Sequence, residues 1–168
     1  MNYRFCPKCG GELVGFLDGE VNRLKCSTCS FVFYQNSKPC VTPVILQDGK
    51  ILFARRANEP AKGKWDLPGG FLEAGEHPVD GLRREVKEEM DLDLVSAKFL
   101  GIFMDKYPVY DYDTLNIAYI CEVKGEPKPN DDVSELGWFS FNNLPELFFL
   151  NARETIEVLK KYLKNHGF

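Results

Sequence analysis

The alternation of apolar and polar positions predicts most of the strands in this chain. Short runs rich in β-branched and aromatic residues predict strands at residues 12–17, 21–25, 40–46, 50–55, 94–104, 114–123 and 136–141. Asp18-Gly19 and Asp48-Gly49 lie between the first two and the next two of these runs, and Asp-Gly favours the tight turn of a β-hairpin.

Helical spacing of apolar residues occurs twice. Residues 78–90 carry a stripe formed by Val79, Leu82, Val86 and Met90, and Pro78 suits the first position of a helix. A second helix is predicted over residues 152–165. Because strands outnumber helices and alternate irregularly with them, the predicted fold class is α+β with a mixed sheet, not a doubly wound parallel sheet.

Composition and charge narrow the function classes. The 168 residues suffice for one ordinary domain with a small appendage, and 44% are hydrophobic, which excludes wholesale disorder. The formal net charge of -4 gives no electrostatic reason to expect nucleic-acid binding. No apolar run approaches the roughly 20 residues that span a bilayer, and residues 1–5 lack a signal-peptide pattern, so we expect a cytoplasmic protein with no membrane partner.

Four of the six cysteines form two C-x-x-C pairs, Cys6 with Cys9 and Cys26 with Cys29, separated by 16 residues. This doubled motif has the spacing of a tetrahedral Zn²⁺ site. A redox dithiol needs only one such pair, and a cytosolic chain does not readily keep two disulfides. We therefore predict a small β zinc ribbon over residues 1–36.

Several features indicate that this zinc is structural. Four thiolates close the coordination shell and leave no position for a reacting water. A segment of about 35 residues buries too little surface to fold alone, so the metal supplies the missing free energy. Residues 36–39 are predicted to be the linker to a second domain over residues 37–168, in which Cys40 and Cys121 are expected to be small buried hydrophobic residues.

Candidate chemistry concentrates on the helix at residues 78–90. Glu85, Glu88 and Glu89 lie at i, i+3 and i+4, so they share one face and repel one another by a few tenths of a kcal/mol per pair. Arg84 and Lys87 are expected to point elsewhere and to offset this repulsion only in part. Mg²⁺ or Mn²⁺ would be suitable counter-charges for hard carboxylate oxygens, although a solvated acidic face is the alternative.

Glycines near this helix fit the same interpretation. Gly69 and Gly70 precede the helix, and without side chains their carbonyl groups can approach a metal closely. Gly81 lies within the helix, where it costs about 1 kcal/mol relative to alanine. Either space for a ligand or close helix packing would explain it.

The segment from Gly70 to Leu92 follows a spaced pattern. Five residues separate Gly70 from Glu76 and seven more separate Glu76 from Arg84-Glu85, after which come Val86, Glu88-Glu89 and Leu92. This pattern resembles the Nudix box of Nudix hydrolases over 23 residues with one departure, because Asp91 stands where the family has glycine. Asp91 falls at the expected helix end, and aspartate tolerates the left-handed conformation there better than most residues.

Residues 63–70 and 135–139 are also similar to Nudix sequences, so the resemblance extends over most of residues 40–168. It implies a Nudix-type α/β/α sandwich and metal-dependent hydrolysis of a nucleoside diphosphate linked to another group. It also implies that the magnesium ligands are Gly70, Glu85, Glu88 and Glu89. Arg84 is implied to orient a glutamate through a bidentate pair, and Glu76 to have a supporting role.

The general base of this family often comes from an acidic residue outside the box. The late acidic loop offers Asp131, Asp132 and Glu135, of which we favour Glu135 and Asp132. A solvated turn is an equally good interpretation of any one of them.

Arginines and tyrosines are candidates for substrate binding. Arg55 and Arg56 end a predicted strand, and alternation sends them to opposite faces, so at most one should meet substrate phosphates. Tyr107 and Tyr110 follow the box and could stack on a base, although such tyrosines more often serve packing.

The substrate prediction rests on weaker resemblances. A zinc ribbon before a Nudix domain resembles the NADH pyrophosphatase group, but that group's Ser-Gln-Pro-Trp type signature is absent here. Pro108 resembles a proline of ADP-ribose pyrophosphatases, and Tyr110 a tyrosine of dinucleoside polyphosphate hydrolases. We expect ADP-ribose or a related nucleotide sugar, with NADH or NAD⁺, cleaved to AMP and nicotinamide mononucleotide, as the alternative.

Two further hypotheses come from other classes of function. The protein could be a nucleic-acid-binding or nucleotide-sensing module, but the basic residues of the ribbon are nearly cancelled by its acidic ones and an intact metal face argues for turnover. The ribbon could instead serve only for docking or for formation of a homodimer.

Overall fold

A mixed sheet forms the frame of the larger part of the protein. The computed structural model describes residues 3–108 and 112–166. The sheet has seven strands, of which five run in the order β10, β5, β4, β9, β8, while β6 pairs with β5 and β7 with β4. Their bounds are β4 Lys38–Gln47, β5 Lys50–Arg56, β6 Trp65–Asp66, β7 Gly70–Phe71, β8 Asp93–Tyr107, β9 Tyr112–Lys124 and β10 Val133–Ser140.

Strand β4 lies at the centre of this sheet and makes it mixed. It runs parallel to β9, from Lys38 opposite Thr114 to Ile45 opposite Cys121. It returns antiparallel into β5 through Asp48 and Gly49, which both have positive φ (50° and 71°), as a two-residue hairpin turn of this kind requires. The predicted α+β fold with a mixed sheet is confirmed.

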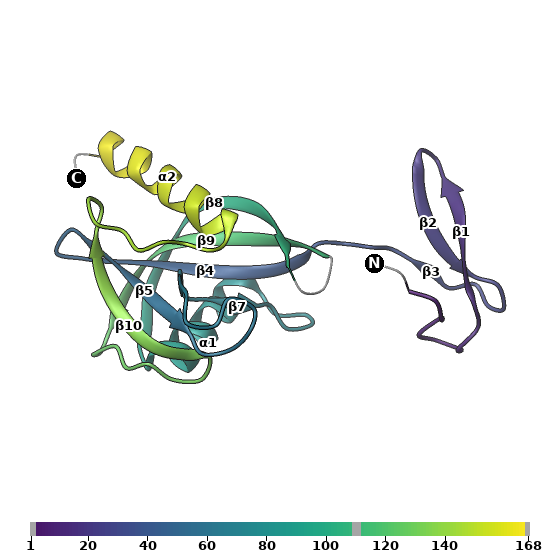
Figure 1. Cartoon of the computed structure of the whole chain (residues 1–168), viewed down its shortest axis with the longest axis horizontal. Coiled ribbons are helices and arrows are strands. Elements are labelled where there is room, and N and C mark those ends of the chain that lie inside the picture. Colours follow the sequence, from purple (N-terminus) through teal and green to yellow (C-terminus); the bar gives the residue numbers. More distant parts are fainter. Residues whose placement is uncertain (1–2, 109–111, 167–168) are drawn as a thin grey trace.

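Two helices cover opposite faces of the sheet (Figure 1). Helix α1, Pro78–Met90, packs Leu82, Val86 and Met90 into a buried cluster with Val41 and Leu52 of the sheet. Helix α2, Leu150–Asn165, packs Ala152, Ile156 and Leu159 against Ile51 and Phe53. Neighbouring strand residues point to opposite faces, so Leu52 meets one helix while Ile51 and Phe53 meet the other. This arrangement is the predicted α/β/α sandwich.

Helix α1 is held firmly at its core face and at both ends. Leu82, Val86 and Met90 are completely buried, and each contributes about 1.5–3 kcal/mol by leaving water. His77 caps the first turn by accepting a hydrogen bond from the Val79 N–H. Asp91 ends the helix in the left-handed conformation (φ 53°), as predicted for the position where the family has glycine.

The N-terminal segment forms a separate three-stranded sheet. Its strands are β1 Leu13–Asp18, β2 Val21–Cys26 and β3 Val32–Phe33. A small cluster of Cys6, Leu13 and Cys26, with Leu24 and Phe31 packed against it, forms its core. Figure 1 shows this ribbon apart from the sandwich, at the end of the chain that leads into β4. Because Lys38 and Pro39 already pair with β9, the linker ends earlier than predicted.

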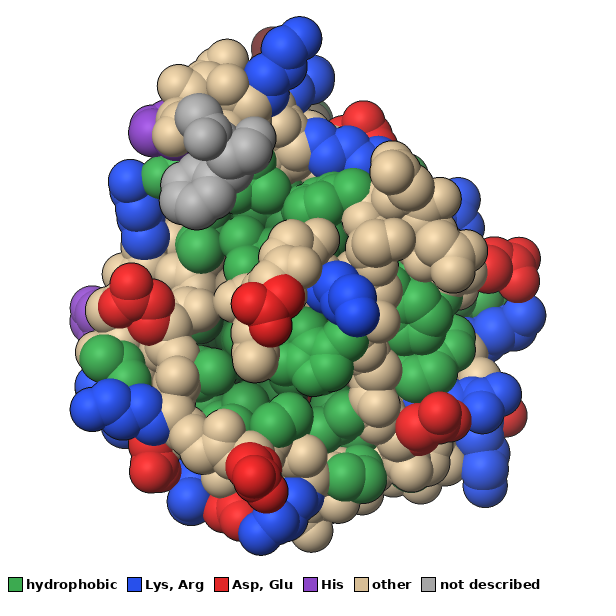
Figure 2. Space-filling view, turned by 90° about the vertical axis from the view of Figure 1, so that its left-hand side faces the viewer, with side chains coloured by type: hydrophobic (Ala, Val, Ile, Leu, Met, Phe, Trp, Pro, Cys, Tyr) green, Lys and Arg blue, Asp and Glu red, His purple; other side chains and the backbone are tan. Residues whose placement is uncertain are grey.

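Apolar side chains also gather at the far end of the sandwich, around the turn between β4 and β5 (Figure 2). A groove there is lined by Leu46, Phe141 and Leu163, with Lys160 and Lys164 beside them. It lies at the C-terminal end of α2, away from the acidic face of α1. Within residues 3–108 and 112–166, no helix is long and apolar enough to cross a membrane.

Candidate active site

Two buried carboxylates face the short strand β7. Glu85 and Glu89 on α1 are each only 8% exposed. The Gly69 N–H donates a 2.7 Å hydrogen bond to Glu89 Oε2. A Cβ atom built on Gly70 would overlap the Glu85 carboxylate. Glycine at position 70 therefore lets the strand backbone lie directly against the acidic helix face.

Arg84 links the acidic side chains. Its Nε and Nη2 atoms donate to the two carboxylate oxygens of Glu76 at 3.0 Å each, and its Nη1 donates to Glu85 at 2.8 Å and to Glu88 at 2.9 Å. The expectation that Arg84 points away from the acidic face is therefore wrong. Its long side chain reaches back over the face, because the Glu76 turn folds against the helix and offers a bidentate partner.

Packing explains the glycine within the helix. A Cβ on Gly81 would overlap the Leu72 side chain and lie 2.9 Å from Glu76 Oε2. The small residue therefore lets the Glu76 turn approach α1, which is how Glu76 comes within reach of Arg84.

Burial makes the ionised forms of these carboxylates costly. It raises the pKa of Glu89 to about 8, against the opposing effect of the Gly69 N–H, with the charges of Glu85, Asp66 and Asp132 raising it further. Burial also raises the pKa of Glu85, while Arg84 lowers it. A divalent cation beside them would favour the ionised form of both carboxylates, and carboxylate oxygens are the donors that Mg²⁺ and Mn²⁺ prefer. The donor set therefore fits such a cation.

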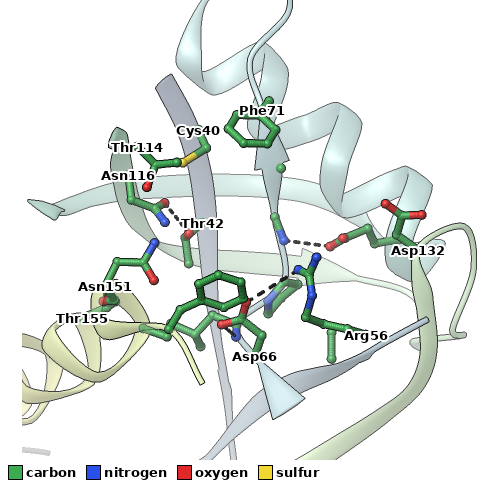
Figure 3. A pocket seen from close by; sticks show the side chains of 18 of the residues that line it. Cys40, Thr42, Arg56, Asp66, Phe71, Thr114, Asn116, Asp132, Asn151 and Thr155 are labelled. Atoms are coloured by element: carbon green, nitrogen blue, oxygen red, sulfur yellow. Dashed lines mark hydrogen bonds and ion pairs between the residues drawn. The ribbon is translucent and has the colours of Figure 1, made fainter. Parts of the chain in front are cut away.

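A cavity of about 150 Å³ opens beside the carboxylates (Figure 3). Charged side chains on it are Glu89, Asp132, Arg56, Asp66 and Lys106. Its aromatic members are Phe71, Tyr107 and Phe149, and its uncharged polar members are Thr42, Thr114, Asn116, Asn151 and Thr155. Burial raises the pKa of Asp66 to about 7, against the effect of Arg56, whose guanidinium lies 3.8 Å away. The cavity thus joins an acidic rim to a polar and aromatic interior.

The four paired cysteines form a second site in the ribbon. One sulfur atom from each of Cys6, Cys9, Cys26 and Cys29 lies within 4.8 Å of the others. Cys26 Sγ accepts hydrogen bonds from the Thr28 and Cys29 N–H groups at 3.3 and 3.4 Å, which lower the pKa of Cys26 to about 6. This geometry fits a tetrahedral metal ion held by four thiolates.

Comparison with known families decides the identity of the chain. The NUDIX domain model matches residues 37–161, and the Nudix N-terminal model matches residues 4–35. The chain belongs to the Nudix hydrolase family. The resemblance seen in the sequence is thus confirmed, together with the N-terminal zinc-ribbon module.

This Nudix protein aligns with most of one curated relative but with little more than half of another. It is 35% identical over 132 residues to an ADP-ribose pyrophosphatase of Methanocaldococcus jannaschii, which covers 78% of this chain and 76% of the relative. It is 30% identical over 158 residues to the NAD-capped RNA hydrolase NudC of Vibrio atlanticus, covering 92% of this chain but 56% of the relative. The chain therefore spans little more than half of that NudC protein.

Solved Nudix structures share the fold. A NUDIX hydrolase from Nitrosomonas europaea aligns with a TM-score of 0.78 at 25% identity, over 98% of this chain and 94% of that one. A MutT NUDIX hydrolase from Burkholderia pseudomallei aligns with a TM-score of 0.70 at 26% identity, over 74% and 99%. The first alignment includes the ribbon, so the two-part architecture recurs.

The remaining candidate site residues of this Nudix domain differ in whether they line the cavity. Arg56 and Asp132 line the cavity, whereas Arg55 and Glu135 do not. Arg55 Nη1 contacts Glu135 Oε2 at 2.9 Å, and both side chains are about half exposed, at 45% and 54%. As the strand alternation predicts, only one of the two arginines reaches the cavity.

Of the two candidate tyrosines, Tyr107 lies on the cavity and packs edge-on against Phe71, with ring centroids 5.6 Å apart. Tyr110 lies outside the described residues. Sequence reasoning missed Asp66, Asn116 and Asn151. Asn116 could have been noticed, because it is a polar residue among the apolar residues Leu115, Ile117 and Ala118 of a predicted strand. Asn151 could not, because asparagine is common at the start of a helix.

Proposed function

We propose that this protein is a pyrophosphohydrolase that uses Mg²⁺ or Mn²⁺ to cleave ADP-ribose or a related nucleotide sugar. The observation that carries the proposal is the pair of buried carboxylates, Glu85 and Glu89, pressed against the Gly69-Gly70 backbone beside the cavity. Arg84 pairs with Glu85, but among the described residues no lysine or arginine forms an ion pair with Glu89, and a carboxylate is costly to bury without a cation. A purely solvated acidic face would not bury them.

The proposed ligands of the cation are Glu85, Glu88, Glu89 and the Gly70 carbonyl. When bound, the metal neutralises the pyrophosphate and lowers the pKa of an attacking water. Arg84 orients Glu76, Glu85 and Glu88 through its hydrogen bonds and is a positioning residue. Arg56, on the cavity, would bind substrate phosphate oxygens.

Asp132 is the better candidate for the group that takes a proton from the water. It lines the cavity, and Asn58 donates to its Oδ1, which leaves Oδ2 for the proton. Glu135 is held by Arg55 outside the cavity, so we place it below Asp132.

Two features bear on the substrate. A relative of which this chain covers 76% is named an ADP-ribose pyrophosphatase, which supports ADP-ribose. NADH or NAD⁺ is the second candidate, because the similarity to NudC runs over 92% of this chain and includes the ribbon.

We further propose that the ribbon, over residues 1–36, holds a structural Zn²⁺ and that the hydrolase domain occupies residues 37–168. Four sulfur ligands suit zinc and exclude a reacting water. Reduced thiolates of this kind are typical of cytoplasmic proteins.

The direct test is turnover by the full chain with Mg²⁺. ADP-ribose and water should give AMP and ribose 5-phosphate, and NADH should give AMP and reduced nicotinamide mononucleotide more slowly. Chromatography of the products distinguishes the two. No turnover of any nucleotide diphosphate derivative, with salt-sensitive binding of RNA or DNA instead, would show a binding module rather than an enzyme.

A glycine variant tests the close contact between β7 and α1. Gly70→Ala should place its Cβ on the Glu85 carboxylate and displace it. A displacement near 1 Å is expected to lower kcat/KM by about 100-fold. Gly15→Ala is the matched control, because a Cβ there meets no atom within 4 Å. Equal activity of the two variants would contradict the proposed contact.

A further inference from the structure

We infer that the cavity wall formed by Thr42, Asn116 and Asn151 reads the hydrogen-bonding edge of one nitrogen heterocycle of the substrate. This inference rests on the proposed function, since it names the part of the nucleotide that enters the cavity. In Figure 3 these side chains lie on the side of the cavity opposite Asp132, so the two ends of a bound nucleotide would meet different walls.

Two strands fix the orientation of Asn116. Thr42 on β4 and Asn116 on β9 lie on neighbouring parallel strands, and Thr42 Oγ1 donates a 2.6 Å hydrogen bond to Asn116 Oδ1. An asparagine amide has one carbonyl oxygen and one NH₂ group. Because Thr42 occupies the oxygen, the NH₂ group of Asn116 is the part available to a ligand.

Asn151 is positioned by a residue from another strand. Helix α2 has Phe149 at its N-cap, which offers no side-chain acceptor. Asp105 of β8 takes that role, since its Oδ2 accepts hydrogen bonds from the Leu150 and Asn151 N–H groups at 2.7 and 3.1 Å. Asp105 thereby fixes the first turn of α2 at the cavity, and it is a positioning residue for Asn151.

The other hydroxyl groups on this wall already donate to the protein. Thr114 Oγ1 donates to the Asp105 carbonyl at 3.3 Å, and Thr155 Oγ1 donates to the Asn151 carbonyl at 2.7 Å. Within the part of the chain that the structure describes, neither the Asn116 nor the Asn151 NH₂ group donates to another protein group. The two side-chain amides thus present their NH₂ donors together with the side-chain oxygen Oδ1 of Asn151, which is distinct from the backbone carbonyl that Thr155 occupies.

An edge with an acceptor beside a donor complements this wall. The ring nitrogen and amino group of adenine form such an edge, as do the carbonyl and NH₂ of nicotinamide, and asparagine pairs with adenine in this way elsewhere. A cavity of 150 Å³ in another protein holds a benzene molecule, so the volume of about 150 Å³ leaves room for a ring at this wall. Phe71, Tyr107 and Phe149 form the aromatic part of the lining.

Nuclear magnetic resonance of the ¹⁵N-labelled full chain with Mg²⁺ tests this inference. We expect the side-chain NH₂ signals of Asn116 and Asn151, assigned with Asn116→Asp and Asn151→Asp, to shift with AMP or with nicotinamide mononucleotide. Ribose 5-phosphate should leave them in place. The nucleotide that causes the larger shifts identifies the ring, adenine or nicotinamide, that binds at this wall. Equal shifts with ribose 5-phosphate, or no shift with any of the three, would overturn the inference.

Kinetics give a second readout. Asn151→Ala should raise the KM for ADP-ribose by about 3–10-fold with kcat nearly unchanged, the effect of one lost hydrogen bond. Asp105→Leu should have the same effect, and Asp105→Asn should not, because asparagine also caps helices. Asn143→Ala, an exposed asparagine elsewhere, is the control.

The two proposals can fail separately. Hydrolysis of ADP-ribose by wild type, with wild-type KM values for Asn151→Ala and Asp105→Leu, would overturn the inference alone. Failure of wild type to hydrolyse any nucleotide, with the amide signals still moved by AMP, would overturn only the proposed function.

Discussion

Glu89→Gln is expected to lower kcat by about 100- to 1000-fold. The substitution removes one negative charge from the proposed metal site without changing its size, and the loss corresponds to the several kcal/mol that a bound cation contributes to a phosphoryl transition state. Steady-state hydrolysis of ADP-ribose at saturating Mg²⁺ measures it.

The same variant should keep the fold. The glutamine carbonyl can still accept the Gly69 N–H, and a neutral amide at a site only 8% exposed avoids the cost of burying a charge. Its unfolding temperature without divalent cations should therefore equal or exceed that of wild type.

Glu157→Gln is the matched control for Glu89→Gln. Glu157 also lies on a helix and pairs with Lys160, but its side chain is exposed and it is on α2. It should have wild-type activity. Near-wild-type turnover by Glu89→Gln would show that Glu89 is not a metal ligand.

Cys26→Ser is expected to release the metal from the ribbon and to unfold it. Cys26 is buried, its sulfur accepts two backbone N–H groups, and it belongs to the small ribbon core. Serine is a poor zinc ligand, and the ribbon has little other burial to stabilise it. Zinc content by elemental analysis and proteolysis of residues 1–36 measure the two effects.

Cys121→Ala is the control for this change, because Cys121 is a buried cysteine of the sandwich and lies outside the four-cysteine cluster. It should retain one zinc per chain. Full zinc content in Cys26→Ser would contradict a four-thiolate site.

The sequence predicted those parts of the two sites that lie within one helix or one short motif. Helix α1 spans the predicted residues 78–90, because proline at its start, an apolar stripe and a left-handed Asp91 at its end all act within a few residues of one another. The cysteine cluster was predictable for the same reason, since doubled C-x-x-C pairs converge wherever a ribbon forms.

Features that depend on contact between distant elements were not predictable. Strands β6 and β7 have two residues each, too few for any periodicity, and they exist because β5 and β4 lie beside them. Arg84 reaches Glu76 only because Gly81 lets the preceding turn approach. Asn116 and Asn151 come together from a strand and a helix that are far apart in the sequence.

The place where the ribbon joins the sandwich limits its reach. Lys38 opens the central strand opposite Thr114, and Cys40 pairs with Phe71, so the chain enters the sheet among residues that line the cavity. Only residues 34–37 separate β3 from β4, so the Cα atoms of Phe33 and Lys38 can be at most about 18 Å apart. Any molecule captured by the ribbon would therefore be kept close to the end of β4 where Cys40 and Thr114 line the cavity, at an effective concentration of the order of millimolar.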